Sequence, residues 1–356
     1  MRISVRGIMT TKTRYFVILS LSILTVGVGT GLTAYYVGFP AGAAAGSAAD
    51  ELRLVSSKAV IVAYADVQKV MTSELRQRLL RAMPAQESGQ REFQNLTGIN
   101  IETDITHVIA FIEPGPAAGA SVQGAGMVLA SGLFDEVKIE SLMREHGATV
   151  EAYKDKRLIV AVPNGGRPVP DANGAPAAGL TPAHPELALA FLKPGLMAVG
   201  STNLIRQSVD LEHGGENLTD NTEIMNLIRS IDSGNAWAVG RFDAIQSAGN
   251  LPPVLSQLPA ITWFSVTGQI NDTISGAVRA ETRDEDAAKN LRDVVNGFLA
   301  LAKLQAGSKP AFQALVQSLQ LGGTGKTVEL SFAVPGAVFD LIESAGNQAR
   351  RKEPAH

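Results

Sequence analysis

The sequence predicts an α+β fold made of two tandem ferredoxin-like (βαββαβ) units, with antiparallel sheets and helices on one face. The first observation is an element order that repeats. Strand, helix, strand, strand, helix and strand patterns run through residues 58–200 and again through residues 236–334. The second is a junction of strand, Asp and helix that recurs at Asp66, Asp135 and Asp243. These features predict two similar units in one chain.

The composition bounds the class of protein. The chain has 356 residues, of which 45% are hydrophobic and 18% are charged, so it can build a sizeable core but is too polar for several membrane spans. There is no Cys, which excludes disulfides, Cys zinc sites, Fe–S clusters and thiol nucleophiles. The net charge is −3, and the residues after the basic N-terminus are more acidic than the whole. This balance argues against nucleic-acid binding and, for the body as a whole, against binding an anionic membrane surface.

Residues 15–37 form an uncharged segment that is long enough to cross a bilayer. At 1.5 Å per residue a helix of this length spans about 34 Å, against a hydrocarbon core of about 30 Å. Residues 1–14 are basic and are expected to stay in the cytoplasm, which places the rest of the chain outside. The basic residues of this N-terminus are Arg2, Arg6, Lys12 and Arg14. We expect a single-pass anchor in the cytoplasmic membrane, with the body in the periplasm or at the cell exterior.

A cleaved signal peptide is the alternative for this segment. Ala43, Ala44 and Ala45 could serve as its small-residue cleavage site, although the apolar run is longer than an ordinary signal core. Residues 38–57 begin with an Ala/Gly-rich stretch, and they are expected to form a flexible stalk.

The first repeat is assigned to residues 58–214. Asp66 and Asp135 stand where an N-cap is expected, between a strand and apolar residues at helical spacing. Lys193-Pro194-Gly195 suits a type II turn of a hairpin. The Pro/Gly-rich residues 163–185 form a long polar loop, which is read as a tolerated insertion or a binding loop. The expected strands are 58–65, 106–112, 126–134, 150–153, 157–162, 187–192 and 196–200, and the expected helices are 66–83, 90–96, 135–146 and 201–213.

The second repeat is assigned to residues 215–345, followed by a tail over 346–356. Asp220 and Glu223 have capping-box spacing at the start of a helix. Asp284 is expected to begin the longest helix. The expected strands are 236–242, 261–270, 274–280 and 327–334, and the expected helices are 220–231, 284–302, 311–319 and one from 336.

Three stretches of the chain carry a resemblance to a known family. They read LALAFLKPGLMAVGSTNLIRQSVD from Leu187, NLTDNTEIMNLI from Asn217 and NAWAVGRFDAI from Asn235. Together with the N-terminal span and the stalk, they resemble a family of single-pass, membrane-anchored bacterial envelope proteins whose domain has no assigned function. The resemblance implies a bacterial envelope location. It brings no catalytic residue with it.

Residues 322–327, GGTGKT, resemble a phosphate-binding loop. The P-loop pattern requires Gly at position 320, where Gln320 stands, and it requires a strand before and a helix after the loop. Here a helix precedes and a strand follows. A tight glycine turn is therefore the favoured interpretation, and no nucleotide is expected to bind.

For the other candidate side chains, a role in the fold is favoured over a role in catalysis or in binding a metal or ligand. His146 and His213 precede Gly at helix ends, where an imidazole complements the helix dipole. Asp284, Glu285 and Asp286 suit a helix start better than a cation site. The remaining candidates are His107, without a partner at ligand spacing, His184, in the Pro-rich loop, and Trp237 and Trp263, which are expected in the core.

The sequence therefore predicts no catalytic, cofactor-binding or metal-ligating residue. Without such a site, the fold alone cannot establish an activity. We expect a non-enzymatic interaction or scaffold module of the bacterial envelope. It would be attached to the lipid bilayer through residues 15–37 and would bind an envelope protein partner. The alternatives are a binder or carrier of a lipid or other apolar ligand, and an enzyme with a dispersed site.

Overall fold

The computed structural model describes residues 50–74, 76, 94–95, 97–114, 125–161, 187–231, 234, 236–243, 261–270, 273–306, 310–334, 336 and 338. The predicted cytoplasmic segment, the span 15–37, most of the stalk, the loop 163–185 and the tail lie outside these ranges. Within the part of the chain that the structure describes, no helix has both the length and the apolarity to span a membrane.

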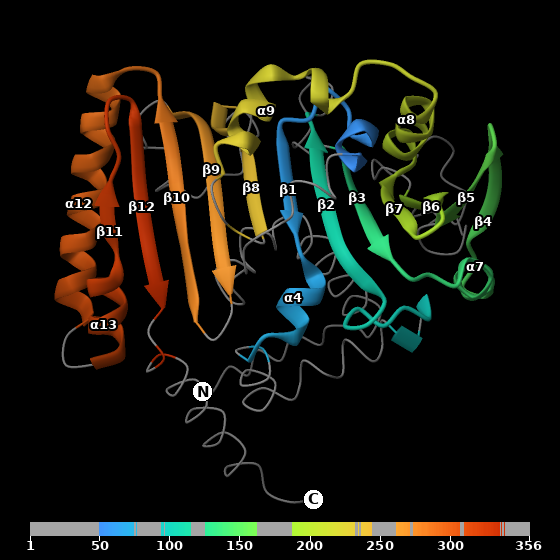
Figure 1. The fold of residues 1–356 in the computed structure, drawn as a ribbon, viewed down its shortest axis with the longest axis horizontal. Helices are drawn as coiled ribbons and strands as arrows, with labels where there is room; N and C mark the ends of the chain where they lie inside the picture. Colours follow the sequence, from blue (N-terminus) through green and yellow to red (C-terminus); the bar gives the residue numbers. More distant parts are fainter. Residues whose placement is uncertain are drawn as a thin grey trace, which may run out of the picture.

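The described strands form one twelve-stranded sheet in which every pairing is antiparallel (Figure 1). Its order is β11-β12-β10-β9-β8-β1-β2-β3-β7-β6-β5-β4. The elements in chain order are η1 (Glu51–Leu54), β1 (Ile61–Ala65), α4 (Val67–Thr72), β2 (Ile105–Glu113), β3 (Ala125–Gly132), α7 (Glu136–Glu145), β4 (Thr149–Tyr153), β5 (Lys156–Ala161), β6 (Leu187–Lys193), β7 (Leu196–Ser201), α8 (Thr202–Glu212), η3 (Leu218–Asp220), α9 (Thr222–Arg229), β8 (Ala236–Arg241), β9 (Ile261–Ile270), β10 (Ile274–Thr282), α12 (Glu285–Ala306), α13 (Pro310–Ser318), β11 (Gln320–Gly322) and β12 (Thr327–Val334). An α+β fold with a large antiparallel sheet is thus confirmed.

The two predicted ferredoxin-like units are not confirmed, because the two parts of the chain share one continuous sheet. β1 pairs with β2 on one side and with β8 on the other, so the first strands of the two predicted repeats lie next to each other. β1, β2 and β3 follow one another outward in one direction, and β8, β9 and β10 do so in the other. The two parts of the chain therefore extend a common sheet and do not close into separate units.

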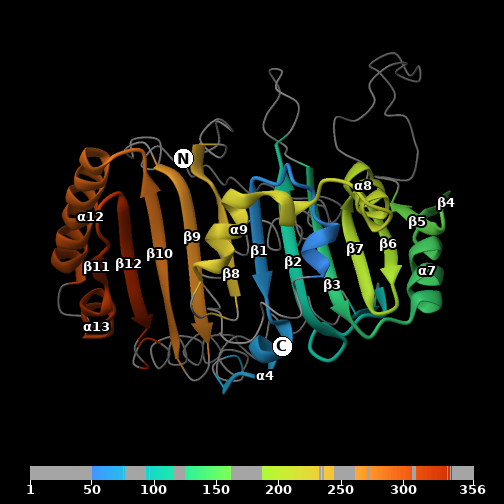
Figure 2. The same ribbon diagram turned by 45° about the horizontal axis from the view of Figure 1, so that its top comes forward.

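Helices cover both faces of the sheet, so the prediction of helices on one face is wrong. The register places Tyr64 and Ile109 on the face that packs against η1, α8 and α9, which we call the α8 face. The opposite face, which we call the α12 face, carries Ala130 beneath α7 and Ala280 beneath α12. Alternate residues of a strand point to opposite faces, and both faces of these strands are apolar enough to hold a helix. Figure 2 shows α7 and α12 near opposite ends of the sheet.

The largest core cluster lies on the α8 face and crosses the seam between β1 and β8. It combines buried strand residues with residues of the covering helices. Its members on either side of the seam include Val62, Tyr64, Trp237 and Val239, and α8 contributes Ile205. The burial of these side chains joins the two parts of the sheet into one hydrophobic unit.

Residues 51–57, which the sequence assigns to the stalk, belong to the folded body. Leu52, Leu54 and Val55 are buried in the main core cluster, and Ser56 forms a β-bridge with Asn217. The apolar Leu52, Leu54 and Val55 give this short segment enough surface to bury. The predicted stalk is therefore too long at its C-terminal end, because residues 51–57 do not belong to it.

Two of the three strand–Asp–helix junctions are caps as predicted. The Asp66 carboxylate accepts a hydrogen bond from the Lys69 amide, and the Asp135 carboxylate accepts one from the Lys138 amide, each at 3.0 Å. The residues that Asp243 would cap lie outside the described residues, and its carboxylate forms an ion pair with Arg241.

The caps of α8 and α9 differ in detail from the prediction. Ser201, which begins the predicted helix 201–213 and was expected to cap it, is the N-cap of α8, but its hydroxyl makes no capping bond. The capping box joins Asn217 and Asp220 at η3, one turn before the predicted position. Asn221 then caps α9 by accepting from the Ile224 amide. Asn is as good a cap as Asp, so sequence spacing alone could not decide between the neighbouring positions.

Candidate functional site

The GGTGKT segment is a turn between β11 and β12. Gly323 and Gly325 adopt positive φ angles of 92° and 57°. The carbonyl oxygens of Gly325 and Thr327 accept from the Arg292 guanidinium at 3.0 and 2.9 Å. A phosphate loop would turn amide N–H groups inward, whereas this turn presents oxygens to a cation. The prediction of a glycine turn is confirmed.

His146 and His213 are C-caps of α7 and α8, as predicted. Nδ1 of His146 lies 2.7 Å from the Leu142 carbonyl oxygen, and Nδ1 of His213 lies 3.0 Å from that of Val209. The glycines that follow both residues have positive φ angles, which is typical of a helix end. The two imidazoles therefore serve the helix termini. His184 lies outside the described residues.

Asp284 begins α12, as expected. Its carboxylate accepts from the Ala287 amide at 2.8 Å. This backbone hydrogen bond, followed by one from Arg283, lowers the pKa of the Asp284 carboxyl from its ordinary value. Glu285 and Asp286 occupy the first turn. Within the described ranges, no group of three or more His, Asp or Glu side chains could hold a metal ion.

Trp237 is a core residue, as predicted, and Trp263 is only partly buried. Trp237 stacks on Tyr64 with a centroid separation of 5.8 Å and an interplanar angle of 15°. Trp263 lies under the Arg241 guanidinium, whose central carbon is 5.7 Å from a ring centroid of the indole. Trp263 therefore combines packing with a cation–π contact.

A partly buried polar cluster links Glu51, His107 and Ser131. Nε2 of His107 lies 3.0 and 2.9 Å from the two carboxylate oxygens of Glu51, and the Ser131 hydroxyl donates to the same carboxylate. The His107 ring also lies against Tyr64, at a centroid separation of 5.6 Å. The cluster fixes η1 to the neighbouring strands β2 and β3, where the register pairs His107 with Ser131.

Sequence reasoning missed this cluster, because it searched for partners of His107 at short spacing. Glu51 lies 56 positions before His107, and Ser131 lies 80 positions after Glu51. The local signal is that the polar His107 and Ser131 stand in strands made mostly of apolar residues. Such residues need partners when they are buried.

The connectivity of this cluster differs from that of a serine hydrolase. In a catalytic triad the serine hydrogen-bonds to the histidine, which in turn bonds to the carboxylate. Here both Ser131 and His107 bond to Glu51, which occupies the centre. In this arrangement the Ser131 hydroxyl donates to the carboxylate and not to the imidazole, so these contacts do not form the serine–histidine–carboxylate relay of a triad. The geometry supports a structural clasp.

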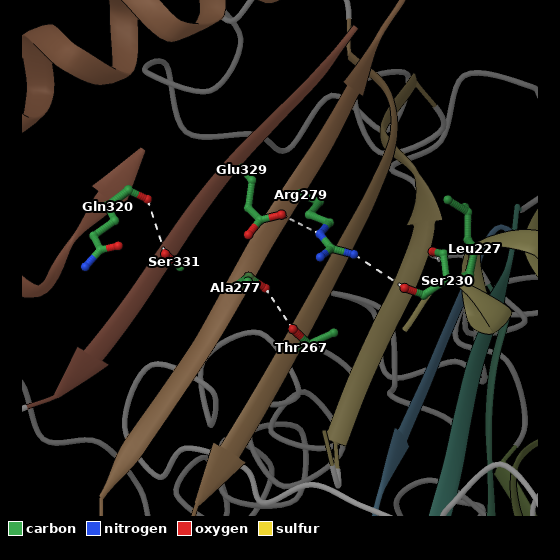
Figure 3. A network of polar contacts seen from close by, with 8 residues as sticks. All are labelled: Leu227, Ser230, Thr267, Ala277, Arg279, Gln320, Glu329 and Ser331. Carbon is green, nitrogen blue, oxygen red and sulfur yellow. Dashed lines mark hydrogen bonds and ion pairs between the residues drawn. The ribbon is translucent and has the colours of Figure 1, made fainter. Parts of the chain in front are cut away.

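The α8 face becomes polar beyond β8 (Figure 3). The Arg279 guanidinium donates to Glu329 at 2.6 Å, across the β10–β12 pairing. It also lies 3.4 Å from the Ser230 carbonyl oxygen at the end of α9. Thr267 and Ser331 continue the polar surface on either side. This part of the sheet is therefore stabilised by cross-strand polar pairs.

The helix α12 carries the most extended exposed apolar surface of the described chain. Positions Ala287, Leu291, Val294, Phe298 and Leu301 follow one another at spacings of four and three, which places them on one side of the helix. Ala287 and Leu291 are only 7% and 4% exposed, whereas Val294 is 37% exposed and Phe298 and Leu301 are each 49% exposed. The first half of this stripe is thus packed and the second half is not.

Neighbouring residues extend this apolar surface. On the α12 face, Val278 of β10 is 39% exposed, although Ala280, two residues further along, packs against α12. Leu304, near the end of α12, is 80% exposed. We call the residues Val294, Phe298, Leu301 and Leu304 the α12 patch. It is the strongest candidate for a binding surface.

The comparisons with known proteins give no family. No family model matches the chain. A search among curated proteins finds no match either. One solved structure, described as crystal form I of TP0453, aligns with 83% of this chain and 97% of its own, at 9% identity and a TM-score of 0.43. Nothing about fold or function is transferred at that level of similarity.

Proposed function

We propose that this chain is a non-enzymatic interaction protein of a bacterial envelope, tethered by one N-terminal span to the cytoplasmic membrane. The observation that carries the proposal is the uncharged segment 15–37, which follows four basic residues. Basic residues are retained on the cytoplasmic side, so the body would face the periplasm or the cell exterior. The resemblance of residues 187–245 to membrane-anchored envelope proteins belongs to the same proposal.

The start of the folded body supports a short tether. Since Leu52 and Leu54 are core residues, the flexible stalk covers no more than residues 38–49. Twelve extended residues reach about 40 Å at most. The body would therefore stay close to the bilayer, within reach of partners that lie in or on the membrane.

The polar clusters support a structural rather than a chemical role. The Glu51 carboxylate is engaged by His107 and Ser131, and the turn at residues 322–327 directs its oxygens to Arg292. These groups hold elements together. The α12 patch is a better candidate for an interaction surface than any of these polar clusters.

A second candidate function is the binding of a lipid or another apolar ligand. It is favoured by the half-exposed Val278, Phe298 and Leu301, which would gain from burial against an acyl chain. Mass spectrometry of lipids and proteins that co-purify with the native protein tests both candidates. A stoichiometric lipid would favour the second function, and a reproducible protein partner the first.

The tether is tested by topology. A reporter that is active only outside the cytoplasm, fused after His356, should be active, and the chain should resist extraction with alkaline carbonate. A silent reporter at normal expression contradicts the orientation. Release of a chain that lacks about the first 45 residues supports the cleaved signal peptide, whose processing site is small and apolar.

A further inference from the structure

We draw no further inference here: the strongest candidate, the α12 patch on the second half of helix α12, carries none, because nothing in the structure shows what covers this exposed apolar surface.

Discussion

At the scale of single residues, the Glu51 carboxylate shows how a polar group stabilises an apolar sheet. It lies at the start of the folded body and accepts from His107 and Ser131, two polar residues of neighbouring strands. The His107 and Glu51 side chains are only 10% and 14% exposed. A buried polar group without a partner is destabilising, so each member of the cluster depends on the others. The cluster thereby holds η1 against the sheet.

Glu51→Ala should destabilise the protein by about 3 kcal/mol, since it leaves two buried polar groups without this acceptor. Glu145→Ala, at an exposed position at the end of α7, is the matched control and should change stability by less than about 0.5 kcal/mol. Urea unfolding of both variants measures the difference. If the two losses are equal, the cluster does not have the structural role described. A catalytic Glu51 would instead be indicated by lost function at unchanged stability.

At the scale of elements, caps and turns fix where helices and strands begin and end. Asp66 and Asp135 each accept an amide hydrogen at the start of a helix, and His146 and His213 each close a helix end. These contacts join residues three or four positions apart. They depend on side-chain type and spacing, so they could be predicted from the sequence.

Asp135→Ala should cost about 1 kcal/mol, because the first turn of α7 loses an acceptor for its amide groups. Asp66→Ala should cost a similar amount for the same reason. Asp135→Asn is the matched control and should be nearly neutral, since Asn caps as well as Asp. Urea melts decide the matter. Losses near zero in both Ala variants would contradict the capping role.

The turn between β11 and β12 gives a prediction that separates structure from nucleotide binding. Gly323→Ala should destabilise by about 2 kcal/mol, because φ is positive there and a Cβ would lie 2.4 Å from the Thr327 carbonyl oxygen. Lys326→Ala should change stability by less than about 0.5 kcal/mol. Thermal melts compare the two. ATP binding that is lost in Lys326→Ala would restore the phosphate-loop interpretation.

At the scale of the whole molecule, one sheet and one main core replace the two expected units. The β1–β8 pairing and the core cluster across it bury Tyr64 against Trp237 at the seam. The two faces of the sheet differ in what covers them. The α8 face is covered by helices up to β8 and is polar beyond it, whereas the α12 face ends in the exposed α12 patch.

Unfolding should therefore be a single cooperative transition. The fluorescence of Trp237 and Trp263, both in the second half, should lose its native value at the same urea concentration as the far-ultraviolet circular dichroism. Leu158→Ala in β5, where the side chain is fully buried, should lower both midpoints together, with a loss of about 2–5 kcal/mol. A tryptophan midpoint that does not move in this variant would show that the two halves unfold independently.

The sequence by itself determined the local structure and the class of fold. Alternating or continuous apolar runs located most strands, and the Asp caps and the glycines after His146 and His213 located helix ends. The Pro194-Gly195 turn was predicted from the order of its two residues, and Gly195 has the positive φ of 76° that a type II turn requires. All these features depend on interactions within a few residues.

Only the tertiary structure decided which strands pair, which faces the helices cover and which polar residues meet. β1 pairs with β8, and Glu51 meets His107, across long stretches of chain. The two-residue alternation of side chains along a strand shows that the strand has two faces. It does not show which strand is its neighbour in the sheet, because many pairings bury similar apolar area. The exposure of the α12 patch is equally a tertiary result. Its residues continue the helical stripe of Leu291, but Leu291 is buried and they are exposed.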